Sequence, residues 1–298
     1  MTIQPDTTTV VEPGSTEWLG TISPSKSAAI VGLSRWESPY RLWHRMKGLV
    51  PPEPPKDIFD TGHDAEHMLA ARWRRENPKW QLSNGEVQIR HNRFGFPVVA
   101  TIDRRARRGA HRRVIEFKIA RTLDQLEEWG DPDLTDDQPP ADYYVQVLSQ
   151  QHITGYMKFP AHLMMVGPYF KHRTYVIEYD PAAAYALEEQ WEKFYRSLQS
   201  DTPPPLDDTV PTYECVRDLH PDIDGSTAQL DPILSADWLD SERELKTAKN
   251  HVVGLKTRVL DGMGNAQRAV ATVIRDGLPV EIPVARRQPT GRGSVALY

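Results

Sequence analysis

The chain has 298 residues, of which 39% are hydrophobic and 26% are charged, and its formal net charge is −5. This composition excludes a disordered protein and allows one large domain or two small ones. No apolar run approaches the about 20 residues that cross a bilayer, and no basic and then apolar signal peptide opens the chain, so we expect a cytoplasmic protein without membrane contact. The single cysteine, Cys215, excludes internal disulfides and a four-cysteine zinc or iron–sulfur site within one chain.

Charge is distributed unevenly along the sequence. Residues 86–121 contain ten Lys or Arg and three acids, whereas residues 124–142 contain eight acids and no base. Residues 200–244 contain twelve acids and two bases. The basic segment predicts a polyanionic partner, and the acidic segments would limit non-specific binding. The alternative is a solvated, arginine-rich turn.

We expect a flexible N-terminus over residues 1–15 and a core domain over residues 16–200. Serine–proline steps and helical apolar spacing predict the helices of this core. They cover residues 26–31, 38–47, 60–76, 141–154 and 181–198. Apolar runs bounded by turn signals predict the strands. They cover residues 96–102, 114–120, 161–167 and 173–179. This order fits an α+β (α/β) fold with a mixed β-sheet flanked by helices.

Beyond the core we expect an acidic, proline-rich loop over residues 201–236 and then a helix with a β-hairpin over residues 237–285. Apolar residues recur at roughly helical spacing from residue 238 to residue 260. The step Asp276-Gly277 between two apolar runs predicts the hairpin turn. The last residues, 286–298, are basic, and we expect them to be flexible.

The run of residues 114–120 is apolar except for Glu116 and Lys118. These two residues alternate with Phe117, so both project from one face of a strand while Phe117 enters the core. Isolated charges on an apolar strand cost several kcal/mol unless they are paired or bound to metal. The pattern is short, and its alternative is an ordinary Glu–Lys pair at a strand edge.

Asp103 ends the preceding strand and can join this pair. Residues 104–113 include Gly109 and predict the turn of a hairpin that brings Asp103 close to Glu116. Six arginines crowd this connection, and we expect them to bind DNA phosphates. They are Arg104, Arg105, Arg107, Arg108, Arg112 and Arg113.

Two helices offer further polar side chains. On the 60–76 helix, Glu66 is placed to be a third carboxylate near a metal ion. His63 and His67 have the i, i+4 spacing of a zinc pair, but no third soft ligand is near, so a hard oxygen site explains more. On the 141–154 helix, Gln146 suits a hydrogen bond to a phosphate or a water, although a glutamine on a helix surface is common.

The chain resembles the YqaJ or lambda-exonuclease type of viral recombinase, a branch of the PD-(D/E)xK nuclease superfamily. The resemblance rests on short motifs that occur in the family's order between Trp18 and Gly167. They are Ile22-Ser23-Pro24-Ser25 with Ala28 to Gly32, Gly62 to Glu66, Ala100 to Asp103, Ile115 to Lys118, and Tyr144 to Gln146 with Thr154-Gly155. The resemblance implies a restriction-endonuclease-like core.

The resemblance also implies a metal site. Asp103, Glu116 and the main-chain carbonyl of Phe117 would bind a divalent ion, with Glu66 contributing directly or through water. Hard oxygen ligands select Mg²⁺, and Mn²⁺ would substitute for it. Lys118 would position or deprotonate the attacking water, of which positioning is the safer role because a free lysine is a poor base.

The remaining site residues follow from the same resemblance. Gln146 would hold the water, the lysine or a DNA phosphate. Many family members carry an arginine before the first motif that binds a terminal 5′ phosphate, and Trp18 stands in its place here, where it would stack on a terminal base. Ser25 matches the motif, and Lys26 or Arg35 would supply the positive charge toward DNA.

The implied function is a Mg²⁺-dependent DNA exonuclease that acts 5′ to 3′ on linear duplex ends in phage-type recombination. Such enzymes commonly form a homo-oligomeric ring around DNA and act with a single-strand annealing protein. Two alternatives stay open. One is a structure-specific or RecB-like endonuclease with the same metal site. The other is a catalytically inactive DNA-binding accessory protein, against which the four charged site residues argue.

Overall fold

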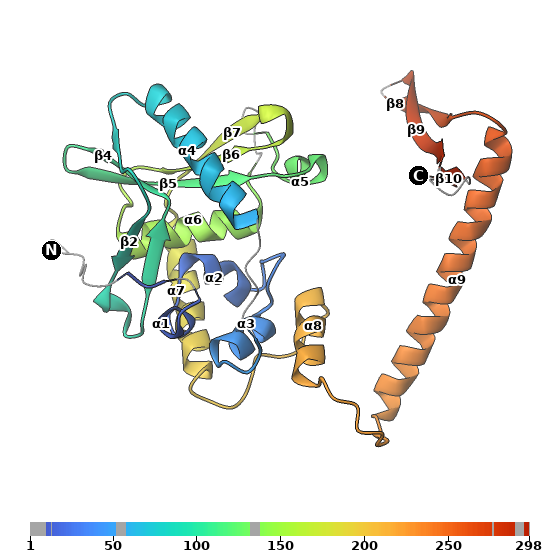
Figure 1. Cartoon of the computed structure of the whole chain (residues 1–298), viewed down its shortest axis with the longest axis horizontal. Helices are drawn as coiled ribbons and strands as arrows, with labels where there is room; N and C mark the ends of the chain where they lie inside the picture. Colours follow the sequence, from blue (N-terminus) through green and yellow to red (C-terminus); the bar gives the residue numbers. More distant parts are fainter. Residues whose placement is uncertain are drawn as a thin grey trace. The chain divides into compact units, whose positions relative to one another are not determined.

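In the computed structural model, the described residues are 10–12, 14–51, 58–131, 138–275, 277–289 and 295–297, without the side chains of residues 58–61, 63, 295 and 296. The chain divides into two compact units, Met1–Asp222 and Ile223–Tyr298. The first unit holds helices α1 to α8 and strands β1 to β7 (Figure 1). Within the described residues, no helix is long and apolar enough to cross a membrane.

The helices of the first unit begin where the sequence provides caps. They are α1 (Thr16–Leu19), α2 (Pro24–Ile30), α3 (Pro39–Met46), α4 (Ile58–Glu76), α5 (Leu123–Glu127), α6 (Ala141–Thr154), α7 (Pro181–Ser197) and α8 (Val210–Leu219). At the start of α3, the Ser38 hydroxyl accepts a hydrogen bond from the Arg41 amide. At the start of α7, the Asp180 carboxylate accepts from two amides of the first turn. Such caps satisfy amides that the helix itself leaves unpaired.

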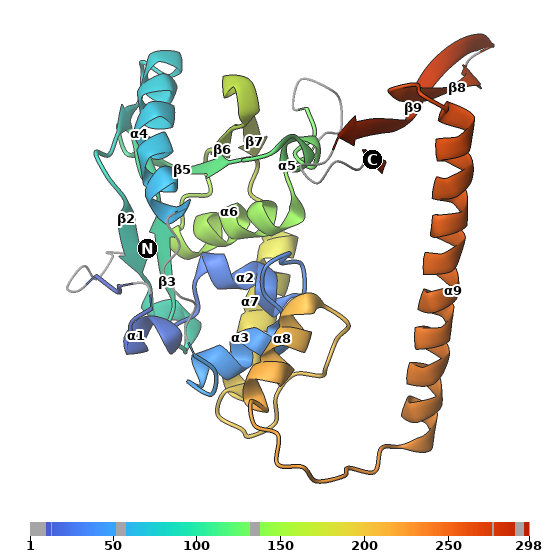
Figure 2. The ribbon, with the colours of Figure 1, turned by 45° about the vertical axis from the view of Figure 1, so that its right-hand side comes forward.

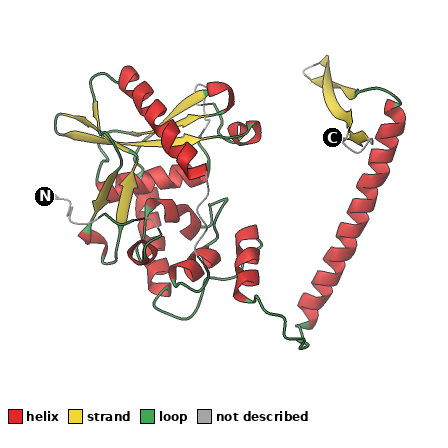
Figure 3. Cartoon of the chain, viewed as in Figure 1, coloured by secondary structure: helices red, strands yellow, loops and turns green. Residues whose placement is uncertain are grey.

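The strands of the first unit form one large sheet and one small one (Figure 3). They are β1 (Gln81–Leu82), β2 (Val87–Arg90), β3 (Val99–Ile102), β4 (Arg104–Arg108), β5 (His111–Ile119), β6 (Ala161–Val166) and β7 (His172–Ile177). The large sheet has the order β1-β4-β5-β6-β7, and β2 pairs with β3. Strands β5 and β6 run parallel and the other neighbours antiparallel. The predicted mixed sheet flanked by helices is confirmed.

Helices cover both faces of the large sheet, with α4 on one face and α6 on the other (Figure 2). Under α4, Leu69 and Trp73 pack with Ile115 and Phe117 of β5. Under α6, Val147 packs with Val114 and residues of β6 and β7. A further apolar cluster joins α6 to α2, α3 and α7. Strand β5 is therefore buried on both faces, as its apolar sequence requires.

The expected turn over residues 104–113 is wrong. Residues 104–108 form β4, which pairs with β5 from Arg108 opposite His111 to Arg104 opposite Ile115. The turn is confined to Gly109 and Ala110, where Gly109 adopts a φ of +59°. Arg104, Ala106 and Arg108 project from one face of β4, and Arg105 and Arg107 project from the other. This period of two is typical of a strand, but the sequence does not show it because arginines occupy both faces.

The acidic loop expected over residues 201–236 also differs from the structure. It contains α8, which packs against α3: the Thr212 hydroxyl donates to the Ser38 hydroxyl over 2.7 Å, and Arg41 pairs with Glu214 at 3.1 Å. Cys215 is buried in this contact. The first unit therefore extends to residue 222 rather than ending at residue 200. Helices α1 and α5 and strands β1 and β2 are likewise additions to the predicted elements, because each is short.

The second unit consists of α9 (Pro232–Met263), β8 (Arg268–Arg275), β9 (Leu278–Pro289) and β10 (Val295–Leu297). The predicted hairpin is present: Arg275 pairs with Leu278 across the turn that contains Gly277. Strand β9 continues beyond residue 285 and pairs with β10, so part of the expected flexible tail is strand. Residues 1–9 and 13 of the expected flexible segment 1–15 lie outside the described residues, as do residues 52–57 and 132–137.

Candidate active site and metal centre

The candidate site lies where β4 begins, at Arg104, so that the edge of β5 beyond Ile115 is not covered by β4. Asp103 occupies the bend between β3 and β4, and the register of Arg104 opposite Ile115 places Asp103 beside Glu116. The Asp103 Oδ2 atom accepts a hydrogen bond of 2.6 Å from the Phe117 amide. The side chain thus substitutes for the missing strand and fixes one carboxylate against the ladder.

Glu116 is almost completely enclosed, with 1% of its surface exposed. Its Oε1 atom pairs with the Lys118 ammonium and accepts from Gln146 Nε2 at 2.6 Å. Its Oε2 atom accepts from Gln150 Nε2 at 2.7 Å. Three donors on this buried carboxylate fix its orientation.

The main-chain carbonyl of Phe117 belongs to the same edge. The Ala120 amide donates to Val166 on β6, so residues of even number on this part of β5 direct their main-chain groups toward β6. Phe117 directs its amide and its carbonyl to the opposite edge, where the amide meets Asp103. The predicted carbonyl ligand therefore lies on the side of Asp103.

Glu66, from α4, reaches this region through Arg104. Arg104 Nη1 pairs with Glu66 Oε2 at 3.2 Å and donates to the carbonyl of Asp103 at 2.5 Å. Arg104 is 3% exposed, so it is a structural partner of Glu66 rather than a surface group for DNA. The expectation that Arg104 binds DNA is corrected accordingly.

The carboxylates of the site repel one another. Burial, together with the nearby Glu116 and Glu66 charges, raises the pKa of Asp103 well above its ordinary range. Burial of Lys118 by itself would lower its pKa, but the Glu116 and Asp103 carboxylates outweigh that effect and raise the pKa above its usual value. Lys118 is therefore an ammonium, which suits positioning and charge stabilisation rather than proton removal.

The donor set fits a small, hard cation. Asp103, Glu116 and the Phe117 carbonyl present oxygen atoms only, the ligand type that Mg²⁺ and Mn²⁺ prefer. Across the described ranges, no group of three acidic, histidine or cysteine ligands gathers in one place, and Glu66 is paired with Arg104. The His63 side chain lies outside the described residues, so the alternative zinc pair with His67 stays a prediction.

Tyr143 joins Lys118 to Arg35. The Lys118 ammonium lies 5.4 Å from the centre of the Tyr143 ring, and the Arg35 guanidinium lies at the same distance from that centre. Arg35 is also paired with Asp142 at 3.2 Å and with Glu128. Arg35 is therefore close to the site, but a DNA phosphate would have to compete with two carboxylates for it.

The N-terminal candidates divide into exposed and buried groups. The Ser25 hydroxyl is exposed and lies 3.0 Å from the Ser23 hydroxyl. Lys26 is 2% exposed, and its ammonium donates to three main-chain carbonyls. They are the carbonyl of Trp18, that of Leu19 at 3.4 Å and that of Thr21 at 2.7 Å. The ammonium also lies 3.9 Å from the centre of the Trp18 ring. The expected DNA contact of Lys26 is corrected: it caps the end of α1 instead.

The arginines of the β4–β5 hairpin fall into two sets because strand side chains alternate between faces. Arg104, Arg108 and Arg113 project toward α4. Arg105, Arg107 and Arg112 project to the face that carries Glu116 and Lys118. In the described part of the chain this second set forms no ion pair; Arg107 and Arg112 donate to the Gly109 carbonyl at 3.2 and 3.1 Å.

Arg113 is enclosed on the α4 face, with 9% of its surface exposed. Its Nη1 atom lies 2.6 Å from His162 Nε2, and Trp73 Nε1 donates to His162 Nδ1 over 3.0 Å. Burial and the Arg113 charge lower the pKa of His162 to about 4. Burial and the positive charge of Arg113 therefore keep His162 neutral, and Arg113 supports the sheet instead of contacting DNA as we had expected.

Two site residues were not assigned from the sequence, Gln150 and Tyr143. Gln150 is fully buried, and besides Glu116 it contacts the carbonyl of Thr101 at 3.0 Å. A usable signal existed, because Gln146 and Gln150 are four residues apart and so share one face of α6. Tyr143 stacks on Trp129 with ring centres 5.0 Å apart, a contact between distant segments that sequence spacing does not indicate.

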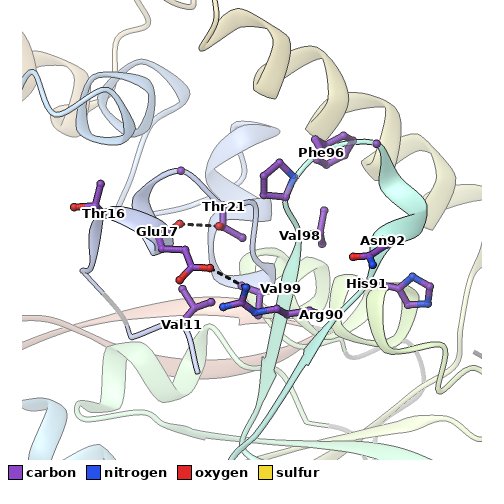
Figure 4. A pocket seen from close by; sticks show the side chains of 13 residues that line it. Val11, Thr16, Glu17, Thr21, Arg90, His91, Asn92, Phe96, Val98 and Val99 are labelled. Carbon is purple, nitrogen blue, oxygen red and sulfur yellow. Dashed lines mark hydrogen bonds and ion pairs between the residues drawn. The ribbon is translucent and has the colours of Figure 1, made fainter. Parts of the chain in front are cut away.

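A separate pocket of about 570 Å³ lies between α1 and the β2–β3 hairpin (Figure 4). Glu17 and Arg90 line it and form an ion pair of 2.8 Å. None of the catalytic candidates is among the described residues of its lining. The pocket is therefore distinct from the carboxylate site on β5.

Comparison with known proteins gives two kinds of match. The uncharacterized protein YqaJ of Bacillus subtilis (strain 168) is 27% identical over 135 residues, which are 45% of this chain and 38% of that protein. The crystal structure of an alkaline exonuclease from Laribacter hongkongensis has a TM-score of 0.47 and 19% identity, covering 61% of this chain and 89% of that one. Its complex with dAMP has a TM-score of 0.48, 20% identity and the same coverage.

A family model covers the part of the chain that holds the site. Residues 18–157 match the model of the YqaJ-like viral recombinase domain, and this range includes Glu66, Asp103, Glu116, Lys118 and Gln146. The match ends within the first unit and leaves the second unit outside it. Residues 18–157 of the chain are therefore similar to the YqaJ-like viral recombinase domain.

Proposed function

We propose that the protein is a divalent-metal-dependent DNA exonuclease that degrades linear duplex DNA from its ends. The observation that carries the proposal is the meeting of Asp103, Glu116 and Lys118 at the open edge of β5, within the part of the chain that matches the YqaJ-like domain model. The 5′ to 3′ direction, the preference for Mg²⁺ and the role in phage-type recombination are finer parts of the same proposal.

In this proposal Asp103, Glu116 and the Phe117 carbonyl hold the metal ion, and Glu66 contributes through water. The bound ion would polarise the scissile phosphate and lower the pKa of water. Lys118 orients the attacking water and stabilises charge on the phosphate, since its ammonium already lies against Glu116. Gln146 and Gln150 keep the Glu116 carboxylate in one orientation.

DNA would approach along the face of the hairpin that continues the site. On β5, Arg112 and Glu116 project from the same face four residues apart, which corresponds to about 13 Å along a strand. Arg105 and Arg107 lie on the neighbouring strand of that face. Their charges are placed to hold phosphates beside the scissile one, and Ser25, Arg35 and Trp18 remain candidates for contacts with the DNA end.

Digestion of end-labelled linear duplex and of covalently closed circular duplex with Mg²⁺ tests the proposal. We expect mononucleotides from the linear form, with the 5′ label released first, and no nicking of the closed circle. Nicking of the circle would support the endonuclease alternative. A parallel digestion of 5′-phosphate and 5′-hydroxyl ends tests whether Trp18 replaces the phosphate-binding arginine, and added single-strand annealing protein tests the proposed partner.

A further inference from the structure

Helix α9 of the second unit carries large apolar side chains on its surface. Trp238 is 62% exposed, Leu245 47%, Val252 49% and Leu255 45%. A long helix in a stable monomer normally buries its apolar stripe against a neighbour. These residues form the surface that we call the α9 seam.

The seam has a seven-residue repeat. Trp238, Leu245, Val252 and Val259 occupy one position of this repeat. A second position of the repeat lies three residues after each of these. It is held by Ser241, Ala248, Leu255 and Gly262, and by Leu234 one repeat before Ser241. This is the a/d pattern of a two-stranded coiled coil, in which positions a and d of each helix face the partner. The 32 residues of α9 are long enough for it.

We propose that α9 pairs with the α9 of a second copy of this chain in an antiparallel two-stranded coiled coil. The seam itself favours this direction. An antiparallel alignment centred between residues 246 and 247 places Leu245 opposite Ala248 and Val252 opposite Ser241. A large side chain then faces a small one in the centre, and larger pairs close both ends, as interdigitating cores require.

The charges beside the seam select the same partner. Positions e and g of the first half of α9 are acidic, at Asp237, Glu242 and Glu244. Those of the second half are basic or histidine, at Lys249, His251, Lys256 and Arg258. In the antiparallel pair Glu242 faces Lys249 and Asp237 faces Arg258, each twice by symmetry. A parallel pair would instead set Asp237 against Glu242.

A second copy explains both features because the helix is complementary to itself. In a two-fold symmetric antiparallel pair, the acidic half of each helix faces the basic half of the other helix. This pairing is independent of the proposed nuclease activity, since the seam lies in the second unit, outside residues 18–157.

Sedimentation equilibrium of the full chain, across a wide range of concentration, tests the pairing. We expect a dimer that Val252→Glu weakens by at least roughly 100-fold, because a carboxylate in the seam is desolvated. Thr257→Glu adds the same charge on the opposite side of the same helix, at a position that is exposed, and should leave the dimer intact. Circular dichroism confirms that both variants retain their helix.

The direction of pairing has its own variants. Glu242→Lys should weaken the dimer by roughly 5-fold, and the exchange Glu242→Lys with Lys249→Glu should restore it, because the pair is reformed with its signs reversed. A tighter dimer with Glu242→Lys would overturn the antiparallel arrangement in favour of a parallel one. A monomeric wild-type chain, or an oligomer that Val252→Glu leaves intact, would overturn the α9 seam as the interface.

Discussion

Gln150 donates a hydrogen bond from Nε2 to the Glu116 carboxylate over 2.7 Å, and the same nitrogen contacts the carbonyl of Thr101 at 3.0 Å. Both neighbours are acceptors, which fixes the orientation of the amide. Its Oε1 atom is buried without a hydrogen-bond partner among the described residues. The Gln150 side chain therefore holds the Glu116 carboxylate through Nε2 while its own Oε1 atom stays without a hydrogen bond.

Removing this amide should impair catalysis more than it impairs folding. Gln150→Leu removes the amide donor from Glu116 Oε2, so we expect a cleavage rate per folded molecule that is lower by roughly 10- to 100-fold, as is typical of groups that orient metal ligands. Gln151→Leu is the matched control, because Gln151 is equally buried but donates to Ile177 at 3.3 Å. Equal rates for the two variants would contradict the role of Gln150.

The division of the hairpin arginines predicts a salt effect. Arg107→Ala or Arg112→Ala should weaken DNA binding and reduce the slope of log affinity against log salt by about 0.9 for each lost phosphate contact. Arg196→Ala removes an equal charge from the exposed surface of α7, where Arg196 pairs with Glu192. Its slope should match that of the wild type. The measurement is a salt titration of the affinity of each variant for an uncleavable duplex.

Burial of neutral His162 predicts a loss of stability in acid. Its pKa is about 4 in the folded state, against 6.5 for an ordinary histidine, so the unfolded chain binds more protons between these values. The free energy of unfolding should fall as the pH drops below 6.5, by about 2 to 3 kcal/mol at pH 4.5.

The variant His162→Gln isolates this contribution, because glutamine does not titrate. Urea unfolding at pH 7 and at pH 4.5 should show a smaller loss for His162→Gln than for the wild type. His172→Gln, at an exposed histidine of β7, should retain the loss of the wild type. The same loss in all three proteins would show that His162 does not control this dependence.

Sequence patterns predicted the core elements well where a physical period was strong. The alternation of Glu116, Phe117 and Lys118 correctly placed the two charges on one face and Phe117 in the core. The helices that carry Glu66 and Gln146 were also predicted, because their apolar spacing is regular. The strand alternation and the apolar spacing of the helices depend only on residues that are close in the sequence, so they can be predicted from it.

Other features depend on contacts between distant segments. Lys26 and Arg104 looked like surface cations, but the structure buries both against carbonyls or a carboxylate that come from other elements. The charge of residues 104–108 concealed a strand because arginine is used on both faces of it. Helix α8 was concealed by an acidic, proline-rich composition, and its contact with α3 supplies the stabilisation that its propensity lacks.

The proposed metal-dependent nuclease site depends on Glu116, and the decisive variant is Glu116→Gln. This change keeps the shape of the side chain and removes its charge. With Mg²⁺, the rate of linear duplex cleavage should fall by roughly 10³-fold or more while DNA binding persists, because several kcal/mol of metal-assisted stabilisation are lost. Glu189→Gln, at an exposed position of α7, should cleave like the wild type. Cleavage by Glu116→Gln at the wild-type rate would contradict a role of Glu116 in a metal-dependent nuclease site.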